Sequence, residues 1–394
     1  MKQYDLLLIA RPDHSYKIYQ GLENSDIKFR YFSFKLFPSW LRYIIKHRKM
    51  RTVRKNVSIC NLLSVVSVMK HNLKIRLFKN ISEYEVFEKF LNRKLGGYEG
   101  KIIHYWPCFS YKVVKEYKKK HRSAITMAEI YFPCHQYVLD KIGPLLRERG
   151  YGHNLDYIYK EAKMYEETMM FEENFVVPSE YVAETYRRYY PDKNYIVVSY
   201  GIFKSTTYKR KAKIVEDHHF KFVYVGKISI EKGCDILMNY FEKHDEFKLV
   251  VLGNILESEA DYFEKYKDCP NITFMGAVPN SDVSKIASTC DIGIHLSRFD
   301  AYSLAVGEII GSGIPVVVST ETGICADIKK YHWGTVTELD EVSIDKAVSV
   351  MTNADNYNSF VDSIYRYFDE NHPTYSQNIV SLYKSILENG RISK

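Results

Sequence analysis

Two lysines five residues apart, Lys227 and Lys232, follow a short apolar run that ends at Gly226. The pattern predicts a buried strand, a tight turn and a helix that begins near Gly233. Such a turn brings backbone amides, a helix N-terminus and two ammonium groups to one point, which suits a diphosphate. The spacing is neither a Walker loop nor Gly-x-Gly-x-x-Gly. The alternative is a plain strand–helix turn with two solvated lysines.

Two carboxylates eight residues apart, Asp300 and Glu308, form the second candidate group. If a helix begins near Ser303, Asp300 stands at its mouth and Glu308 projects about one turn further in. One carboxylate can then accept the hydroxyl protons of a sugar, and the other can accept those of a ribose. The free amides of 301–304 would point at a phosphate or sugar oxygen. The alternative is an N-cap aspartate and an ordinary helical glutamate.

The elements that must position these groups alternate along the chain. Short apolar, β-rich runs separated by amphipathic helical stretches are typical of parallel α/β sheets. The expected strands are Tyr4–Ala10, Ile27–Phe34, Ile102–Trp106, Ala124–Ile130, Asn174–Pro178 and Tyr195–Tyr200, then Lys221–Val225, Lys248–Leu252, Ile272–Gly276, Ile292–Leu296, Pro315–Ser319 and Gly334–Thr337. The polar segment Lys204–His219 separates the two series. Two doubly wound domains would face each other across a cleft, where the ligands of such sheets bind.

The length of 394 residues is enough for two such domains. No apolar run reaches the ~18 residues of a membrane span, and Met1–Ala10 predicts a buried first strand rather than a signal peptide. The 7 cysteines are scattered without a Cys-x-x-Cys pair, which indicates reduced thiols and no structural zinc site. There is no Asp-x-Asp, so we expect no metal. Tyr375–Leu387 has the spacing of a helix with one buried face.

The net charge of +8 is uneven along the chain. Residues 41–55 contain seven basic side chains, from Arg42 to Lys55, and no acidic one. Trp40, Leu41 and Ile44 can share one helical face beside these charges, so the region can lie on anionic lipid. The alternative is the solvated face of a core helix. Binding of nucleic acid is not expected, because no nucleic-acid fold accompanies the charge.

Polar and aromatic residues at the ends of two of the predicted strands are candidates for an acceptor site. They are His104, Trp106 and Glu129. Aromatic rings and a carboxylate suit sugar stacking and hydroxyl binding, while a core or surface role is the alternative. His104 and Cys108 are unsuited to share a metal, since Pro107 opposes the helix that would join them.

The two lysine and carboxylate segments together resemble one family, the retaining GT-B glycosyltransferases of the group-one clan, which are family-four-like and carry a Glu-x7-Glu motif. Val225–Asp235 is similar to that family's strand–Gly–Arg/Lys–x4–Lys–Gly turn. Ser297–Val318 is similar to its Glu-Gly-Phe-Gly-x3-Glu helix and the Ser-Gly-x-Pro-Val-Val strand that follows. Asn271–Val278 resembles the strand and turn that cover the base. The resemblance extends from about Phe175 to Leu387.

The resemblance implies a GT-B fold of two doubly wound, Rossmann-like domains with a C-terminal helix that crosses back to the first. We expect an acceptor-binding domain over 1–203, a linker over 204–219, a nucleotide-sugar-binding domain over 220–372 and the returning helix over 373–394. The implied catalytic residues are Lys227, Lys232 and Asp300, and the implied donor-binding residues are Gly226, Gly276, Ala277, Val278, Ala301, Tyr302, Ser303, Leu304 and Glu308. The lysines neutralise the diphosphate, Glu308 binds the ribose, and 276–278 lie against the base.

The chain departs from the family pattern at several positions. Asp300 stands for the family's first glutamate, and Ala301 and Ser303 stand for its glycines. Glu129 and its neighbour Ala128 lie where many members have a histidine. These changes leave a second hypothesis open, a catalytically inactive GT-B subunit that recognises a nucleotide sugar or glycan. A phosphorylase-like enzyme is disfavoured, since the pyridoxal-phosphate lysine signature is missing.

The function that this resemblance implies is retaining transfer of a hexose from a nucleotide-diphosphate sugar, with UDP favoured over GDP. The acceptor is expected to be lipid-linked or a polysaccharide, in the assembly of bacterial lipopolysaccharide O-antigen or capsule. The resemblance and the thiols together indicate a cytoplasmic protein, peripheral on the inner face of the membrane through residues 41–55.

Overall fold

A computed structural model describes residues 1–12, 15–34, 36–38, 52–53, 55–63, 82–205, 208, 213–215 and 218–392. The first domain contains a seven-stranded parallel sheet in the order β5-β2-β1-β6-β7-β8-β9. Its strands are β1 (Lys2–Ile9), β2 (Phe29–Ser33), β5 (Val57–Ile59), β6 (Tyr98–Tyr105), β7 (Ile125–Glu129), β8 (Asn174–Val177) and β9 (Asn194–Val197). A separate short pair joins β3 (Phe37–Pro38) to β4 (Thr52–Val53).

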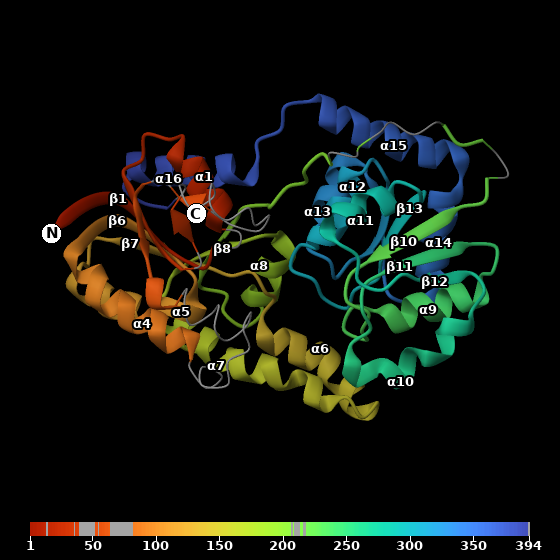
Figure 1. Ribbon diagram of the computed structural model, residues 1–394, viewed down its shortest axis with the longest axis horizontal. Helices are drawn as coiled ribbons and strands as arrows, with labels where there is room; N and C mark the ends of the chain where they lie inside the picture. The colour runs from red at the N-terminus through yellow and green to blue at the C-terminus, as the bar shows by residue number, and fades with distance from the viewer. Residues whose placement is uncertain are drawn as a thin grey trace.

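Helices cover both faces of this sheet (Figure 1). They are α1 (Ser15–Glu23), α4 (Glu83–Lys94), α5 (Pro107–Lys120), α6 (His135–Glu148), α7 (Asp156–Phe171) and α8 (Glu180–Arg187), with the short helices η3 (Leu95–Gly97) and η4 (Gly152–Leu155). The central strand β1 ends in four fully buried residues, Leu6 to Ile9, because both of its faces are covered.

The second domain contains a six-stranded parallel sheet in the order β12-β11-β10-β13-β14-β15. Its strands are β10 (Lys221–Val225), β11 (Lys248–Leu252), β12 (Ile272–Phe274), β13 (Ile292–His295), β14 (Val316–Ser319) and β15 (Gly334–Thr337). Its helices are α9 (Cys234–Lys243), η5 (Glu257–Glu259), α10 (Ala260–Phe263), η6 (Glu264–Asp268), α11 (Asn280–Ala287), α12 (Leu304–Gly311), α13 (Cys325–Tyr331), α14 (Glu341–Thr352) and α15 (Ala354–Asp369). The strand order reverses between β10 and β13, which places a ligand site at the ends of these two strands.

The last helix, α16 (Tyr375–Asn389), crosses back to the first domain, where it packs on α1 and β6 (Figure 1). A capping box of Thr374 and Gln377 starts it, and Gly390 ends it with a φ of +64°. Its buried face includes Ile379 and Tyr383. The predicted GT-B fold, with two facing Rossmann-like domains and a returning helix, is confirmed.

Every strand that the sequence predicted is present, with ends that match the prediction or differ from it by a few residues. The structure adds β5 and the pair β3–β4, which are only two or three residues long and give too little alternation to be read from sequence. The basic region 41–55 lies outside the described residues, apart from 52–53 and 55. Among the described residues, no helix is both long enough and apolar enough to span a membrane.

Candidate active site

The lysine segment forms the predicted strand, turn and helix. Strand β10 ends at Val225, the turn runs to Gly233, and α9 begins at Cys234. Gly233 has a φ of +67°, and a Cβ added there would lie 1.7 Å from the carbonyl oxygen of Leu296. Only glycine therefore lets this turn pass so close to the end of β13. The close approach brings the two candidate segments together.

The carboxylate segment also folds as a loop followed by a helix. Strand β13 ends at His295, and α12 begins at Leu304 after Ser303, whose φ is +63°. The Oδ1 atom of Asp300 accepts hydrogen bonds from the amides of Tyr302 and Ser303, at 3.3 and 2.8 Å. These bonds hold the left-handed backbone at Ser303, where the resembled family has glycine.

Those bonds correct one prediction about the amides of 301–304. The amides of Tyr302 and Ser303 do not point at a ligand, because Asp300 already accepts from both. Leu304 and Ala305 are the first two residues of α12 and line the cavity described below. Their amides lack acceptors within the helix, so they are the ones placed to meet a phosphate or sugar oxygen.

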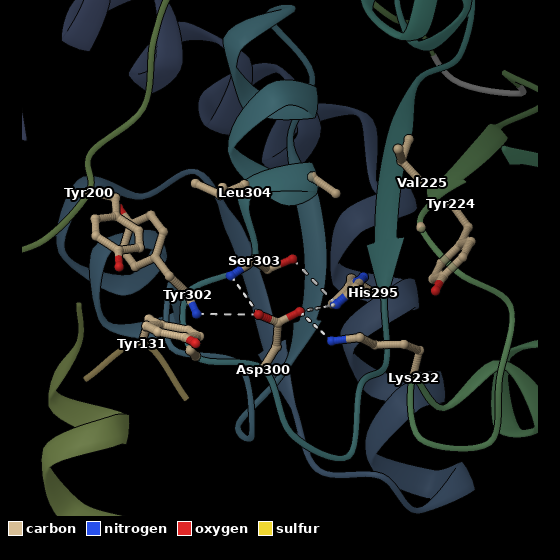
Figure 2. Close-up of a pocket in the computed structure, with 13 residues that line it drawn as sticks. Tyr131, Tyr200, Tyr224, Val225, Lys232, His295, Asp300, Tyr302, Ser303 and Leu304 are labelled. Carbon is tan, nitrogen blue, oxygen red and sulfur yellow. Dashed lines mark hydrogen bonds and ion pairs between the residues drawn. The ribbon is translucent and has the colours of Figure 1, made fainter. Parts of the chain in front are cut away.

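Lys232 and Asp300 form an ion pair, with 2.9 Å between Nζ and Oδ2 (Figure 2). Their side chains are only 22% and 17% exposed. Burial opposes the charge on Asp300, but the Lys232 ammonium and His295 outweigh it and hold its pKa well below the usual range. Burial also opposes the charge on Lys232, but Asp300 and Glu231 raise its pKa. Both groups are therefore ionised across the physiological range.

His295 is a site residue that the sequence reasoning missed. Its Nε2 lies 3.4 Å from Oδ2 of Asp300 and 3.3 Å from Oγ of Ser303. Its ring stacks on Tyr224 of β10, with 5.7 Å between centroids and 7° between planes. A polar residue at the carboxyl end of a central parallel strand was the available signal, since ligands bind at that edge.

A cavity of about 310 Å³ lies over these groups, at the carboxyl ends of β10 and β13. Its second-domain wall contains the predicted residues Gly226, Lys232, Asp300, Ala301, Tyr302, Ser303 and Leu304. The first domain contributes Tyr131 and Tyr200, which face Asp300 from the opposite side (Figure 2). The cavity thus lies between the domains and combines one ammonium, one carboxylate and several aromatic rings.

Lys227 lies outside the cavity wall. Its side chain is 45% exposed, and its Nζ pairs with Oε2 of Glu231 at 3.5 Å. It stands on the same turn as Lys232, which does line the cavity. The structure therefore gives the two lysines unequal positions.

Glu308 lies on α12 and does not line the cavity, although it belongs to the same helix as Leu304. Burial raises the pKa of Glu308, and the nearby Lys17 of α1 opposes that rise. The ammonium of Lys17 also lies over the ring of Phe203, 4.0 Å from its centroid. The predicted ribose carboxylate thus faces a cation from the first domain.

The predicted base-covering turn of Gly276, Ala277 and Val278 follows β12 and lies beside the end of β11. Gly276 has a φ of +67°, and its carbonyl oxygen accepts from the amide of Gly253 at 2.9 Å. The amide of Ala277 donates to Oδ1 of Asn254 at 3.0 Å. The turn is fixed in place, but it does not line the cavity of Lys232.

The acceptor-side predictions need correction. His104 and Glu129 are 0% and 1% exposed and bond to each other, with 2.9 Å between Nε2 and Oε2. Tyr383 and Tyr375 of α16 bond to the other side of this pair, at 2.6 and 3.3 Å. Trp106, 6% exposed, stacks on His104. His104 and Glu129 thus anchor the returning helix, and Trp106 packs on them in the core. Tyr131 and Tyr200 line the cavity instead.

The described residues contain no cluster of three or more His, Cys, Asp or Glu side chains placed to hold a metal ion. The expectation of a metal-independent reaction stays a prediction.

Known proteins match part of the chain in sequence. The sequence model of the family described as glycosyl transferases group 1 matches residues 205–363. A sulfoquinovosyl transferase of Arabidopsis thaliana is 26% identical over 102 residues, which cover 26% of this chain and 20% of the relative. A GDP-mannose-dependent alpha-mannosyltransferase of Corynebacterium glutamicum is 27% identical over 94 residues, covering 24% of this chain and 22% of the relative. The chain thus matches only about a fifth of the length of these two relatives.

Solved structures match the whole chain. Sucrose-phosphate synthase from Thermosynechococcus elongatus has a TM-score of 0.61 at 14% identity, covering 99% of this chain and 100% of that one. The lipopolysaccharide outer core galactosyltransferase WaaB has a TM-score of 0.60 at 14% identity, with the same coverage. Anabaena HepE in complex with UDP and glucose has a TM-score of 0.56 at 12% identity, covering 99% of both chains. The chain therefore has the GT-B fold, and the sequence matches support the group 1 glycosyltransferase superfamily.

Proposed function

We propose that this protein is a retaining glycosyltransferase that moves a hexose from a nucleotide-diphosphate sugar, UDP favoured over GDP, to an acceptor without a metal ion. The observation that carries the proposal is the Lys232–Asp300 pair at the mouth of α12, in a cavity between two Rossmann-like domains. The match of residues 205–363 to group 1 glycosyl transferases supports it. So does the fold of HepE, whose structure holds UDP and glucose.

The parts fit the chemistry of breaking a sugar–phosphate bond. The leaving diphosphate gains negative charge, and the ammonium of Lys232 and the amides that begin α12 supply fixed positive charge beside it. The aromatic wall of Tyr131 and Tyr200 excludes water and offers faces to a sugar ring. In a retaining reaction of this kind, we expect the donor phosphate to take the acceptor proton. The two groups of the cavity wall that could act as a base, Asp300 and His295, are already engaged with Lys232, Ser303 and each other.

The proposed setting is the cytoplasmic face of a bacterial membrane, with a lipid-linked or polysaccharide acceptor in the assembly of lipopolysaccharide O-antigen or capsule. The basic region 41–55 supports this setting through its charge, and the likeness to WaaB is one of fold. Glycosyl transfer does not depend on this setting, so each is tested separately.

Residues 41–55 are expected to bind anionic vesicles. Each basic residue near a charged surface contributes about 1 kcal/mol, so seven of them give salt-sensitive binding. Flotation with phosphatidylglycerol and phosphatidylcholine vesicles at low and high salt measures it. Replacing Arg48, Lys49 and Arg51 by glutamine should reduce flotation with phosphatidylglycerol. Equal flotation with both lipids, or none with either, contradicts the membrane proposal.

Glu308→Ala is expected to weaken binding of the nucleoside diphosphate by about 10-fold to 100-fold, because a charge-assisted hydrogen bond is worth about 1.5–3 kcal/mol. Calorimetric titration with UDP and GDP measures the change. Glu338→Ala is the matched control, since Glu338 bonds Thr320 at the surface and lies outside the cavity wall. Unchanged affinity in Glu308→Ala removes this residue from the donor site.

A thermal-shift panel of UDP, GDP and their sugar derivatives tests the donor proposal directly, because a ligand stabilises the folded state by mass action. We expect a rise in Tm with one nucleotide class, which Lys232→Ala abolishes. A panel in which no nucleotide raises the Tm contradicts the donor assignment.

A further inference from the structure

The segment 149–157 of the first domain contains the connection from α6 to α7 and the first two residues of α7. It lies against the lysine turn of the second domain (Figure 1). Four of its side chains donate hydrogen bonds across the domain boundary, and three of them reach carboxylates that hold the lysine turn. Arg149, Asn154 and Tyr157 each reach a carboxylate of the second domain. We name these three residues the clasp.

Each carboxylate that the clasp reaches holds the turn between β10 and α9. Nη1 of Arg149 donates to Oδ2 of Asp235 at 2.7 Å, at the start of α9. The hydroxyl of Tyr157 donates to Oε1 of Glu231 at 3.2 Å. Glu231 and Asp235 flank Lys232 in the sequence.

The third contact acts through a buried glutamate. Nδ2 of Asn154 donates to Oε1 of Glu259 at 2.8 Å, and Oε2 of Glu259 accepts from the amide of Ile230 at 2.7 Å. Glu259 is 1% exposed. The carboxylate of Glu259 therefore links Asn154 of the first domain to the backbone of the lysine turn through two hydrogen bonds.

The second domain alone already holds part of this turn. Arg298 binds Asp235 through two hydrogen bonds, at 2.6 and 2.8 Å, and its amide donates to the carbonyl oxygen of Glu231 at 3.2 Å. Loss of Arg149 therefore leaves Asp235 paired, so it loosens the turn without leaving a buried charge alone. The clasp adds restraint that exists only while the two domains are in contact.

In the bonds from the clasp to carboxylates, every donor belongs to the first domain and every carboxylate to the second. Asn154 also accepts a hydrogen bond from Oγ of Ser258 of the second domain, at 2.8 Å. Two further hydrogen bonds run from the first domain to the second. The hydroxyl of Tyr151 donates to Asp261 at 3.0 Å, and the hydroxyl of Tyr137 donates to Glu321 at 2.8 Å. This complementarity favours one register of the two domains. It also means that moving the domains apart removes every one of these restraints together.

We propose that Arg149, Asn154 and Tyr157 are positioning residues, which fix the ammonium of Lys232 only when the domains are closed. The inference rests on the proposed function for its catalytic consequence, but not for its structural one. A donor bound in the open form would meet a loosely held Lys232, and closure would complete the site. Coupling of this kind prevents turnover of the donor before the cleft has closed.

Two measurements on the full chain test the clasp, with Arg149→Ala, Asn154→Ala, Tyr157→Phe and the triple variant. The first is hydrogen exchange of the amides of residues 226–235. We expect faster exchange there in the triple variant and a smaller increase in Tyr157→Phe, which removes one hydroxyl and keeps the fold. Tyr159→Phe is the matched control and should change nothing, because Tyr159 lies on the same helix as Tyr157 but accepts its hydrogen bond from Arg147 of its own domain.

The second measurement is steady-state hydrolysis of the nucleotide sugar. We expect kcat to fall about 10-fold in the triple variant with little change in KM, since misplacement of a catalytic group lowers the rate of the chemical step. Arg149→Lys should recover part of the loss. In the Lys232→Ala background the clasp substitutions should cost almost nothing more, because they act through Lys232.

The outcomes separate the clasp from the proposed function. Normal exchange of 226–235 in the triple variant overturns the clasp, whatever the activity. Faster exchange with unchanged kcat overturns its positioning role. A wild-type protein that turns over no nucleotide sugar contradicts the proposed function, while the exchange experiment still decides whether the clasp holds the turn.

Discussion

Lys232→Ala is expected to lower kcat for donor cleavage by about 100-fold or more, the scale for removing one preorganised electrostatic stabiliser. The ammonium lies in the cavity wall, paired with Asp300 at 2.9 Å, so its position is set before the donor binds. The leaving diphosphate carries more charge in the transition state than in the bound donor. An interaction that strengthens along this path lowers the barrier and not only KM.

The size of the effect should depend on the chemistry at this position. Lys232→Arg should recover only part of the rate, because a planar guanidinium does not replace a compact ammonium in a tight turn. Lys227→Ala should cost less, since Lys227 is 45% exposed and outside the cavity wall. Lys243→Ala is the control and should behave as wild type, because Lys243 lies at the far end of α9 and pairs with Glu341 at the surface. Steady-state kinetics that show only a raised KM in Lys232→Ala would exclude the transition-state role.

Asp300→Asn is expected to lower both stability and activity. The carboxylate accepts from two amides through Oδ1, and Oδ2 faces Lys232 and His295. An asparagine has only one acceptor oxygen, so its NH2 group must face either the two amides or Lys232, which are themselves donors. Breaking a buried ion pair in this way costs about 3–5 kcal/mol. Urea denaturation measures the loss of stability, and donor hydrolysis measures the loss of rate. Asp300→Glu, which supplies the carboxylate of the resembled family, should retain more activity than Asp300→Asn.

The stability difference between wild type and Asp300→Asn should depend on pH in one direction. The folded state holds the pKa of Asp300 well below its usual range, despite the opposing effect of burial, because of Lys232 and His295. A depressed pKa contributes stability that is present above the unfolded value of about 3.9 and is lost as the pH falls toward the folded value. The gap in free energy of unfolding should therefore be constant from about pH 5 to 8 and narrow below about pH 4. A gap that widens on acidification would show that Asp300 is not held ionised by these partners.

The strands could be predicted because each is a short apolar run between amphipathic helical stretches. This pattern is typical of a buried strand in a parallel sheet. Lys221–Val225 and Lys248–Leu252 were predicted at their observed bounds. Such runs do not show which distant segments contact each other in the folded protein. Lys232 and Asp300 are 68 residues apart. The close passage of Gly233 beside Leu296 and the bonds of Arg298 to Asp235 and Glu231 bring them together.

The acceptor-side prediction was wrong for a physical reason. His104 and Glu129 stand at strand ends, where ligands often bind, but α16 returns over them and supplies Tyr383 and Tyr375 as partners. A returning helix that is far along the chain cannot be placed on those strand ends from their own sequence. The same reasoning explains why Arg149 gave no signal, since its partner Asp235 belongs to the other domain.

The central claim is that the cavity of Lys232 cleaves a nucleotide-sugar bond with retention. Incubation of the purified protein with UDP- and GDP-hexoses, without acceptor, tests it by chromatography of the released nucleotide and proton NMR of the first sugar anomer formed. The account predicts slow release of one nucleoside diphosphate, a sugar that keeps the donor's anomeric configuration, and loss of both signals in Lys232→Ala. Binding of a nucleotide sugar with no release in the presence or absence of glycan acceptors would instead indicate an inactive binding subunit, and inversion of the anomer would contradict the retaining reaction.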